Sequence, residues 1–396
     1  MISNEMLQLG TKRSVIRELF EYGKKRSAEI GAENVYDFSL GNPNVPAPSI
    51  VNETLLDLLN NTDSTLLHSY TSAQGDLSVR TSISSSINER FGTNLSPNHI
   101  YMTVGAAASL CICAKALTVP GDEFITFAPF FPEYKVFIES AGATLKVVPA
   151  NLETFEINFE ELKKTISCKT KAVLINSPNN PSGAVYSKET IETLCSFLEE
   201  KSKEYGHIIY LISDEPYREL VYDNTQVPYL MNHYKNTLVC YSYSKSLSLP
   251  GERIGYIAVS PELENSNDVY AAICGAGRCL GYVCAPSLFQ HVISKCAFAT
   301  TDIEAYKTNR DILYSALTEY GYDCVRPSGA FYLFVKALEE DATAFCEKAK
   351  QYELLLVPGD DFGCPGYVRI SYCVKKSQIE NSLPAFKDLA LSYSIS

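Results

Sequence analysis

The sequence contains no CxxC pair, although it has 13 cysteines. Two close pairs, Cys111 with Cys113 and Cys279 with Cys284, match neither the spacing of a zinc site nor that of a redox motif. We therefore expect no metal site, and we interpret most cysteines as small buried apolar residues in a reducing compartment. The sequence accordingly predicts a cytoplasmic protein.

Long apolar runs and clusters of basic residues are also absent. The longest apolar runs have the length of a strand, and residues 1–19 hold no apolar core of signal-peptide length, so we expect no membrane span. Asp and Glu outnumber Lys and Arg by 46 to 34, which gives a formal net charge of −12. This balance argues against a nucleic-acid partner, but it is compatible with a small anionic substrate held by a few buried arginines.

Strand-like and helical patterns alternate through the middle of the chain. At 396 residues, 46% of them apolar, the chain is long enough for two globular domains. The stretch Lys188–Tyr205 places Ile191, Leu194, Cys195 and Leu198 on one helical face. Continuous apolar strands separated by helices predict a central, mostly parallel seven-stranded sheet covered on both faces. The predicted strands are His99–Val104, Glu123–Ala128, Thr144–Val148, Lys171–Asn176, His207–Ser213, Thr237–Ser242 and Gly255–Val259.

Both ends of the chain show a different pattern. Thr11–Gly31 is a basic, amphipathic helical stretch. Long helical patterns follow Gly281, and the β-like runs Gly329–Val335 and Tyr367–Tyr372 come after them. We therefore expect an α/β fold in which a smaller α+β domain, built from both termini, accompanies the sheet domain. The expected domains are 49–282 for the large one, and 1–48 with 283–396 for the small one.

The segment Ser242–Gly255 carries the most specific chemical signal. Lys245 lies just beyond a predicted strand end, with Ser242 and Ser244 before it and Arg253 after it. A lysine that forms a Schiff base needs a neutral amine, and a partly desolvated, cation-rich pocket provides one. The two serines and the arginine can bind a phosphate group. The alternative interpretation is a Ser-rich loop with a solvated lysine.

Two further strand ends carry polar residues. Asn176–Gly183 is a rigid turn that would fix Asn180 at the carboxyl edge of the sheet, or simply a tight strand-to-helix turn. A buried carboxylate at Asp214 needs a cation, and a protonated pyridine nitrogen is one that Tyr217 could also reach. The alternative there is a helix-capping aspartate beside a packed tyrosine.

Two small-residue segments bear on phosphate binding. In Thr103–Ser109 a strand leads into a helix whose first N–H groups can bind a phosphate, although the GxxxxGK pattern of a nucleotide P-loop is missing. Gly275–Gly281 nearly spells a dinucleotide fingerprint, but its last glycine is one place late and no strand precedes it directly. We therefore expect no Rossmann-type site.

These segments, in this order, resemble the class I and II aminotransferases of fold type I, which depend on pyridoxal 5′-phosphate. The resemblance is close to the aspartate-aminotransferase-like bacterial subgroup, and it runs from Gly41-Asn42-Pro43 to Arg369-Ile370-Ser371. Its most specific parts are the Ser-x-Ser-Lys…Arg-x-Gly segment and the Asn-Pro-Ser-Gly turn. It implies the fold of the PLP-dependent transferases.

The resemblance implies a cofactor role for each matching residue. Lys245 would hold pyridoxal phosphate as a Schiff base and shuttle a proton between Cα and C4′, and Asp214 would pair with the ring nitrogen. With Tyr217, these are the implied catalytic residues. Phe131 stands where many family members have tryptophan or tyrosine, so it would stack on the ring without a polar tip. The other implied cofactor contacts are Asn180 and Tyr217 at the ring's phenolic oxygen, and Ala106, Ala107, Ser242, Ser244, Arg253 and Tyr70 at the phosphate.

The resemblance also implies a substrate site and a homodimer. Arg369 would clamp the substrate α-carboxylate, helped by Asn180 and by the backbone of Gly41. Tyr70 would come from a neighbouring subunit. Arg278, from that subunit, and Lys115 stand near positions that bind a distal carboxylate in some family members, although both could be surface charges.

The predicted activity is therefore the ping-pong transfer of an amino group from an L-amino acid to a 2-oxo acid such as 2-oxoglutarate. Arg278 and Lys115 favour aspartate or another dicarboxylic donor. One alternative keeps the cofactor but changes the reaction to that of a β-lyase, a decarboxylase or a cyclising synthase. A second alternative is a non-enzymatic binding module with the same fold.

Overall fold

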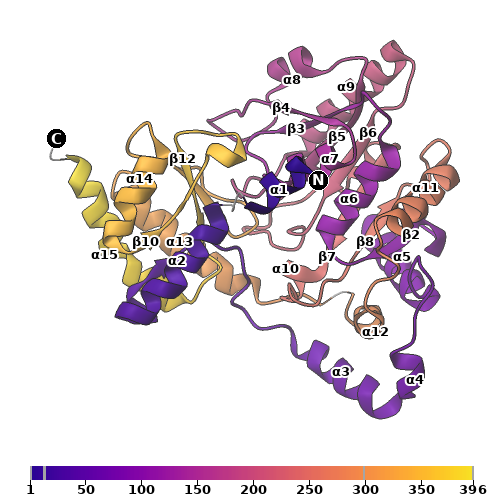
Figure 1. Cartoon of the computed structure of the whole chain (residues 1–396), viewed down its shortest axis with the longest axis horizontal. Coiled ribbons are helices and arrows are strands. Elements are labelled where there is room, and N and C mark those ends of the chain that lie inside the picture. The colour runs from indigo at the N-terminus through magenta and orange to yellow at the C-terminus, as the bar shows by residue number, and fades with distance from the viewer. Residues whose placement is uncertain (1, 12–14, 298, 395–396) are drawn as a thin grey trace.

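The computed structural model describes residues 2–11, 15–297 and 299–394. Its centre is a seven-stranded sheet with the order β2-β8-β7-β6-β5-β3-β4 (Figure 1). Strand β8 runs antiparallel to both of its neighbours, and the remaining pairs are parallel. The prediction of a mostly parallel seven-stranded sheet is thus confirmed. The strands are β2 (Ile100–Thr103), β3 (Glu123–Phe127), β4 (Thr144–Val148), β5 (Thr170–Asn176), β6 (Tyr210–Asp214), β7 (Thr237–Ser242) and β8 (Gly255–Val259).

Helices cover both faces of this sheet. Successive residues of a strand point to opposite sides, so each strand contributes side chains to the core on either face. In β6, Ile212 belongs to the core on the side of α6, α7 and α11, whereas Leu211 packs on the side of α9. The apolar face expected for Lys188–Tyr205 is buried in that second core, as helix α9. The helices of this part are α3 (Ser49–Asn61), α4 (Ser64–Leu67), α5 (Leu77–Phe91), α6 (Ala106–Leu117), α7 (Glu133–Ser140), α8 (Phe159–Thr165), α9 (Lys188–Tyr205), α10 (Tyr243–Ser246), α11 (Ser266–Cys279) and α12 (Ser287–Cys296).

A second group of elements lies beside the sheet, on the left in Figure 1. It combines segments from the two ends of the chain, because β1 pairs in parallel with β10. A separate three-stranded antiparallel sheet has the order β11-β12-β9. The elements of this second group are α2 (Val15–Ile30), β1 (Tyr36–Asp37), α13 (Ile303–Glu319), β9 (Tyr332–Lys336), α14 (Ala342–Ala349), β10 (Leu354–Leu355), β11 (Val357–Pro358), β12 (Tyr367–Ser371) and α15 (Lys376–Ser394). Helix α1 (Asn4–Thr11) lies nearer the middle of the picture.

The packing of α12 bears on the domain boundary. Residues of α12 share a hydrophobic core with α3, α5 and the central sheet. The division into 49–282 and 1–48 with 283–396 stays a proposal, and this packing favours moving its second boundary to the stretch between α12 and α13.

Two sequence features can now be placed. The glycine-rich stretch from Gly275 lies in α11 and the turn after it, and no strand leads into it. Among the described residues, no helix combines the length and the apolar character that crossing a bilayer requires.

Candidate active site

Polar residues from three neighbouring strands meet at one edge of the central sheet. Asn176 ends β5, Asp214 ends β6 and Ser242 ends β7. The carboxyl ends of parallel strands in such sheets are where ligands bind. All three residues line a cavity of about 380 Å³, which is in the size range of small-molecule sites. Twelve of the fifteen residues predicted for the site line it too: Gly41, Ala106, Ala107, Phe131, Asn180, Asp214, Tyr217, Ser242, Ser244, Lys245, Arg253 and Arg369.

The carboxylate of Asp214 is buried with one oxygen satisfied. Its Oδ2 atom accepts a hydrogen bond from the hydroxyl of Tyr134 at 2.5 Å, and Oδ1 has no partner among the described residues. Burial raises the pKa of Asp214 to about 7, although the hydrogen bond from Tyr134 opposes this rise. A buried carboxylate with a free oxygen is suited to a positively charged N–H donor.

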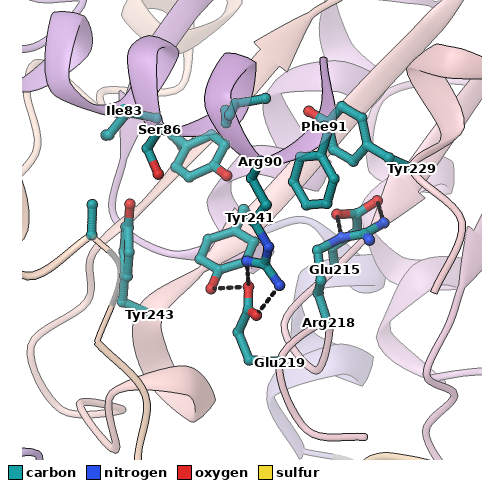
Figure 2. Close-up of a pocket in the computed structure, with 13 residues that line it drawn as sticks. Ile83, Ser86, Arg90, Phe91, Glu215, Arg218, Glu219, Tyr229, Tyr241 and Tyr243 are labelled. Atoms are coloured by element: carbon teal, nitrogen blue, oxygen red, sulfur yellow. Dashed lines mark hydrogen bonds and ion pairs between the residues drawn. The ribbon is translucent and has the colours of Figure 1, made fainter. Parts of the chain in front are cut away.

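Glu215, the residue directly after Asp214, lies in a separate cluster of charged and aromatic side chains (Figure 2). Glu215 pairs with Arg218, and both side chains are almost fully buried. Arg218 also lies against the stacked rings of Phe91 and Tyr229, at about 5 Å from each ring centroid. The small cavity of about 30 Å³ among these residues is lined by paired charges and tyrosines. We interpret this cluster as structural support for the end of β6.

Lys245 has the properties of a reactive amine. Burial lowers the pKa of Lys245 to about 8, and the charges of Arg369 and Arg253 contribute in the same direction. The Nζ atom donates to the carbonyl oxygen of Gly41 at 2.5 Å and lies 5.4 Å from the ring centroid of Phe331. A larger fraction of this amine is therefore neutral at physiological pH than for an ordinary lysine.

An anion-binding cup adjoins the lysine. Helix α6 begins at Ala106, and the first N–H groups of a helix have no partner within it. Ser242 donates to Ser244, hydroxyl to hydroxyl, at 2.8 Å. The guanidinium of Arg253 lies against Gly105, since a Cβ atom at Gly105 would come within 2.6 Å of its Nη2 atom. Amide, hydroxyl and guanidinium donors thus surround one corner of the cavity.

A second arginine lies at the other end of the cavity. Arg369 is buried, and it donates from Nη1 to Oδ1 of Asn180 at 3.0 Å and from Nη2 to the carbonyl of Ser39 at 2.6 Å. Its Nε atom has no partner among the described residues. Asn180 is held in turn by its own N–H, which donates to Oδ1 of Asn176 at 2.7 Å. A carboxylate is the ligand that a buried guanidinium with a spare N–H binds best.

Three predicted site residues do not line the cavity within this chain. Tyr70 is 90% exposed, and Lys115 and Arg278 are exposed on α6 and α11. A role for Tyr70 or Arg278 requires a neighbouring subunit, as the resemblance implies. The role of Lys115 likewise stays a prediction.

Several residues at the site were not found in the sequence, among them Ile16, Arg17, Tyr134 and Tyr332. Ile16, Arg17 and Tyr332 line the cavity, and Tyr134 supports Asp214 from α7. All four come from elements whose position against the sheet depends on packing, so no local motif marks them.

The donor set fits pyridoxal phosphate, the cofactor that the resemblance implies. The free Oδ1 of Asp214 can accept a ring N–H, the Lys245 amine can react with an aldehyde, and the cup at Arg253 can hold a phosphate. Among the described residues, no group of three His, Cys, Asp or Glu side chains could hold a metal ion.

Comparisons with known proteins agree with this geometry. Residues 32–386 match the family described as aminotransferase class I and II. The chain is 31% identical to an aspartate aminotransferase of Thermotoga maritima, over 90% of this chain and 91% of that one. It is 30% identical to a probable aspartate aminotransferase of Methanocaldococcus jannaschii, over 96% and 97% of the two chains. A crystal structure of an amino transferase from Eubacterium rectale superposes with a TM-score of 0.97 at 60% identity, covering 99% of both chains.

Proposed function

The chain belongs to the class I and II aminotransferases and is a transaminase, and we propose that its amino donor is aspartate or another dicarboxylic L-amino acid. The acceptor is a 2-oxo acid such as 2-oxoglutarate, and the two half-reactions alternate at one site. The proposal depends above all on one observation, the convergence of Lys245, Asp214 and Arg369 on a single cavity. The family implies pyridoxal 5′-phosphate as cofactor.

Each side chain at the cavity has one task in holding this cofactor. Lys245 binds it covalently through Nζ, and Asp214 accepts the ring N–H at the free Oδ1. Asn180 and Tyr217 hydrogen-bond the ring's phenolic oxygen, and Phe131 stacks on the ring. The phosphate is held by the N–H groups of Ala106 and Ala107 and by Ser242, Ser244 and Arg253.

The chemistry divides between the cofactor and the protein. When bound, pyridoxal phosphate supplies an electron sink for the charge left on the substrate when a proton leaves Cα. Once the substrate's own amino group has replaced it on the cofactor, the freed amine of Lys245 would take up that proton as general base, which its lowered pKa permits near neutral pH. Arg369 and Asn180 bind the α-carboxylate and so fix which Cα bond faces the lysine.

Substitution of Lys245 tests this assignment. Lys245→Ala removes the amine, so turnover should fall by about 10³-fold or more and the visible absorbance of the holoenzyme should disappear. Borohydride trapping followed by mass spectrometry should locate the cofactor on Lys245 in the wild type. Lys163→Ala, an exposed substitution on α8, is the matched control and should change neither property. Turnover that survives in Lys245→Ala would contradict the proposal.

The dicarboxylic donor is supported by a cation at the cavity. Arg17 of α2 lines the cavity together with Arg369, so a substrate held by its α-carboxylate can meet a second guanidinium with its side chain. The names of the Thermotoga and Methanocaldococcus relatives point the same way. Arg278 keeps its proposed role only in an assembled dimer, and the proposed role of Lys115 stays as the resemblance implies it.

We also propose a homodimer in the cytoplasm. Tyr70 is 90% exposed, as expected of a side chain that reaches the phosphate of another subunit, and α1 exposes Met6, Leu7 and Leu9. All thirteen cysteines are free thiols, which fits a reducing compartment. Light scattering of the purified holoenzyme tests the dimer, and Tyr70→Phe should weaken cofactor binding without changing the measured mass.

A further inference from the structure

Tyr332 lies between the two halves of the cavity. Its hydroxyl is 2.8 Å from that of Tyr217, and the guanidinium of Arg369 lies 4.8 Å from its ring centroid. The side chain is only 2% exposed, and it lines the cavity from the first position of β9. One phenol thus contacts both the residue proposed for the ring oxygen and the residue proposed for the substrate carboxylate.

The backbone of Gly41 leaves room for this phenol. A Cβ atom at Gly41 would come within 2.1 Å of the Tyr332 hydroxyl oxygen, so no larger residue fits there without displacing Tyr332. The carbonyl of Gly41 is also the acceptor for Lys245. Tyr332 is therefore held from one side by Gly41 and from the other by Arg369.

The direction of the hydrogen bond between the two phenols follows from proton counting. A phenol has one proton, and Tyr217 uses it towards the ring oxygen of the cofactor under the proposed function. The bond between the hydroxyls must then be donated by Tyr332. Both groups keep their protons near neutral pH, because burial raises the pKa of Tyr332 to about 12 and raises that of Tyr217 well above its usual value.

We propose that Tyr332 is a positioning residue: it donates to Tyr217, directs the Tyr217 proton towards the cofactor and makes Tyr217 a stronger donor. A hydroxyl that accepts one hydrogen bond donates a stronger one, because the two bonds polarise each other. This inference rests on the proposed function and adds to it a residue that never touches the ring oxygen.

A pH titration of holoenzyme absorbance tests the inference. A hydrogen bond donated to the ring oxygen withdraws negative charge from it. The holoenzyme then holds less tightly the proton whose loss changes the visible absorbance, so the pKa of that transition is lower. Tyr332→Phe keeps the aromatic ring and removes the hydroxyl, so the pKa of the visible transition should rise by about 0.5–1 unit. Tyr217→Phe should raise it further. The double variant should match Tyr217→Phe alone, because Tyr332 acts through Tyr217.

Steady-state kinetics separate the hydroxyl from the ring. Tyr332→Phe keeps the face on which Arg369 lies, so KM for the amino donor should stay within about twofold while kcat falls. Tyr332→Ala removes that face too, so KM should rise as well. Tyr372→Phe is the matched control: Tyr372 is buried in the same core and donates to the carbonyl of Ala330 at 3.3 Å, but it does not line the cavity. It should lower Tm without moving the titration.

Three outcomes would overturn the inference. In the first, the pKa of the visible transition stays unchanged in Tyr332→Phe although it rises in Tyr217→Phe. In the second, the two variants raise that pKa equally and their effects add in the double variant, and in the third, Tyr372→Phe raises it by as much as Tyr332→Phe. The proposed function fails in a distinguishable way, through a wild-type protein that shows no visible absorbance with pyridoxal phosphate or keeps it in Lys245→Ala.

Discussion

Tyr134 donates a hydrogen bond of 2.5 Å to Oδ2 of Asp214, and Oδ1 of the same carboxylate has no partner among the described residues. The described residues therefore provide a hydrogen-bond donor for only one of the two oxygens of this buried carboxylate. An unpaired buried oxygen costs free energy in the absence of a ligand, and a ligand N–H at that oxygen recovers it. The stability of the apoprotein should record this cost.

We expect Asp214→Asn to stabilise the apoprotein at pH 8. The folded-state pKa of Asp214 is about 7, above the usual value of 3.8, so the folded protein binds more protons than the unfolded chain between these values. Its contribution to the free energy of unfolding is therefore lost as pH rises from about 4 to about 7. The variant should exceed the wild type by about 2–4 kcal/mol at pH 8 and much less at pH 4.

Urea denaturation of both apoproteins at the two pH values measures this difference. Tyr134→Phe should have the opposite effect on stability. It removes the hydroxyl that donates to Asp214, so it should destabilise the apoprotein at pH 8. Asp214→Asn should also weaken cofactor binding. An Asn variant that is less stable than wild type at pH 8 would contradict the predicted cost.

Cofactor capture by Lys245 should depend on pH in a defined way. The amine has a pKa of about 8, so its neutral fraction rises about fivefold between pH 7 and pH 8 and less than twofold between pH 8 and pH 9. Stopped-flow absorbance after mixing apoprotein with pyridoxal phosphate should follow this curve. A rate that keeps rising about tenfold per pH unit beyond pH 9 would show an ordinary lysine.

Gly105→Ala should damage the phosphate cup beyond its effect on the backbone. Gly105 has φ +95, and a Cβ atom there would meet the Arg253 guanidinium at 2.6 Å. Gly121 has φ +97 but nothing within 4 Å, so Gly121→Ala reproduces the backbone strain without the collision. Equilibrium titration should show about tenfold weaker cofactor binding in Gly105→Ala relative to Gly121→Ala. Equal affinities would mean that Arg253 is not part of the cup.

Arg17→Ala should change donor preference more than overall activity. Loss of a charged partner for the substrate side chain should lower kcat/KM for aspartate by about 10- to 100-fold. The value for alanine, which has no distal carboxylate, should stay within about twofold. The rate of the first half-reaction, followed by the absorbance change with each amino acid, measures both. A parallel loss for the two donors would remove Arg17 from side-chain recognition.

The sequence predicted the parts of the site that depend on local order. The polar residues Asn176, Asp214 and Ser242 could be recognised at the ends of strands, because an apolar run that stops at a polar residue marks the carboxyl edge of a parallel sheet. Strands β4, β7 and β8 even begin and end at the predicted residues. These features need no knowledge of distant contacts.

The parts that could not be predicted depend on how separate elements pack. Tyr332 meets Tyr217 across 115 positions of sequence, and Tyr134 meets Asp214 across 80. Arg17 reaches the cavity only because α2 packs beside the sheet that contains Arg369. Tyrosines are frequent in this chain, with 26 in total, so composition alone could not single out Tyr332 and Tyr134.

The parallel pairing of Tyr36–Asp37 with Leu354–Leu355 sets an order of events during synthesis. The ribosome releases β6, which carries Asp214, and α10, which carries Lys245, more than 100 residues before β10 exists, and Arg369 emerges later still. The N-terminal segment of a nascent chain must therefore wait, without its strand partner, while the central sheet completes. Under the proposed function, the growing chain therefore contains the lysine that would bind the cofactor before it contains the arginine that would bind the substrate carboxylate.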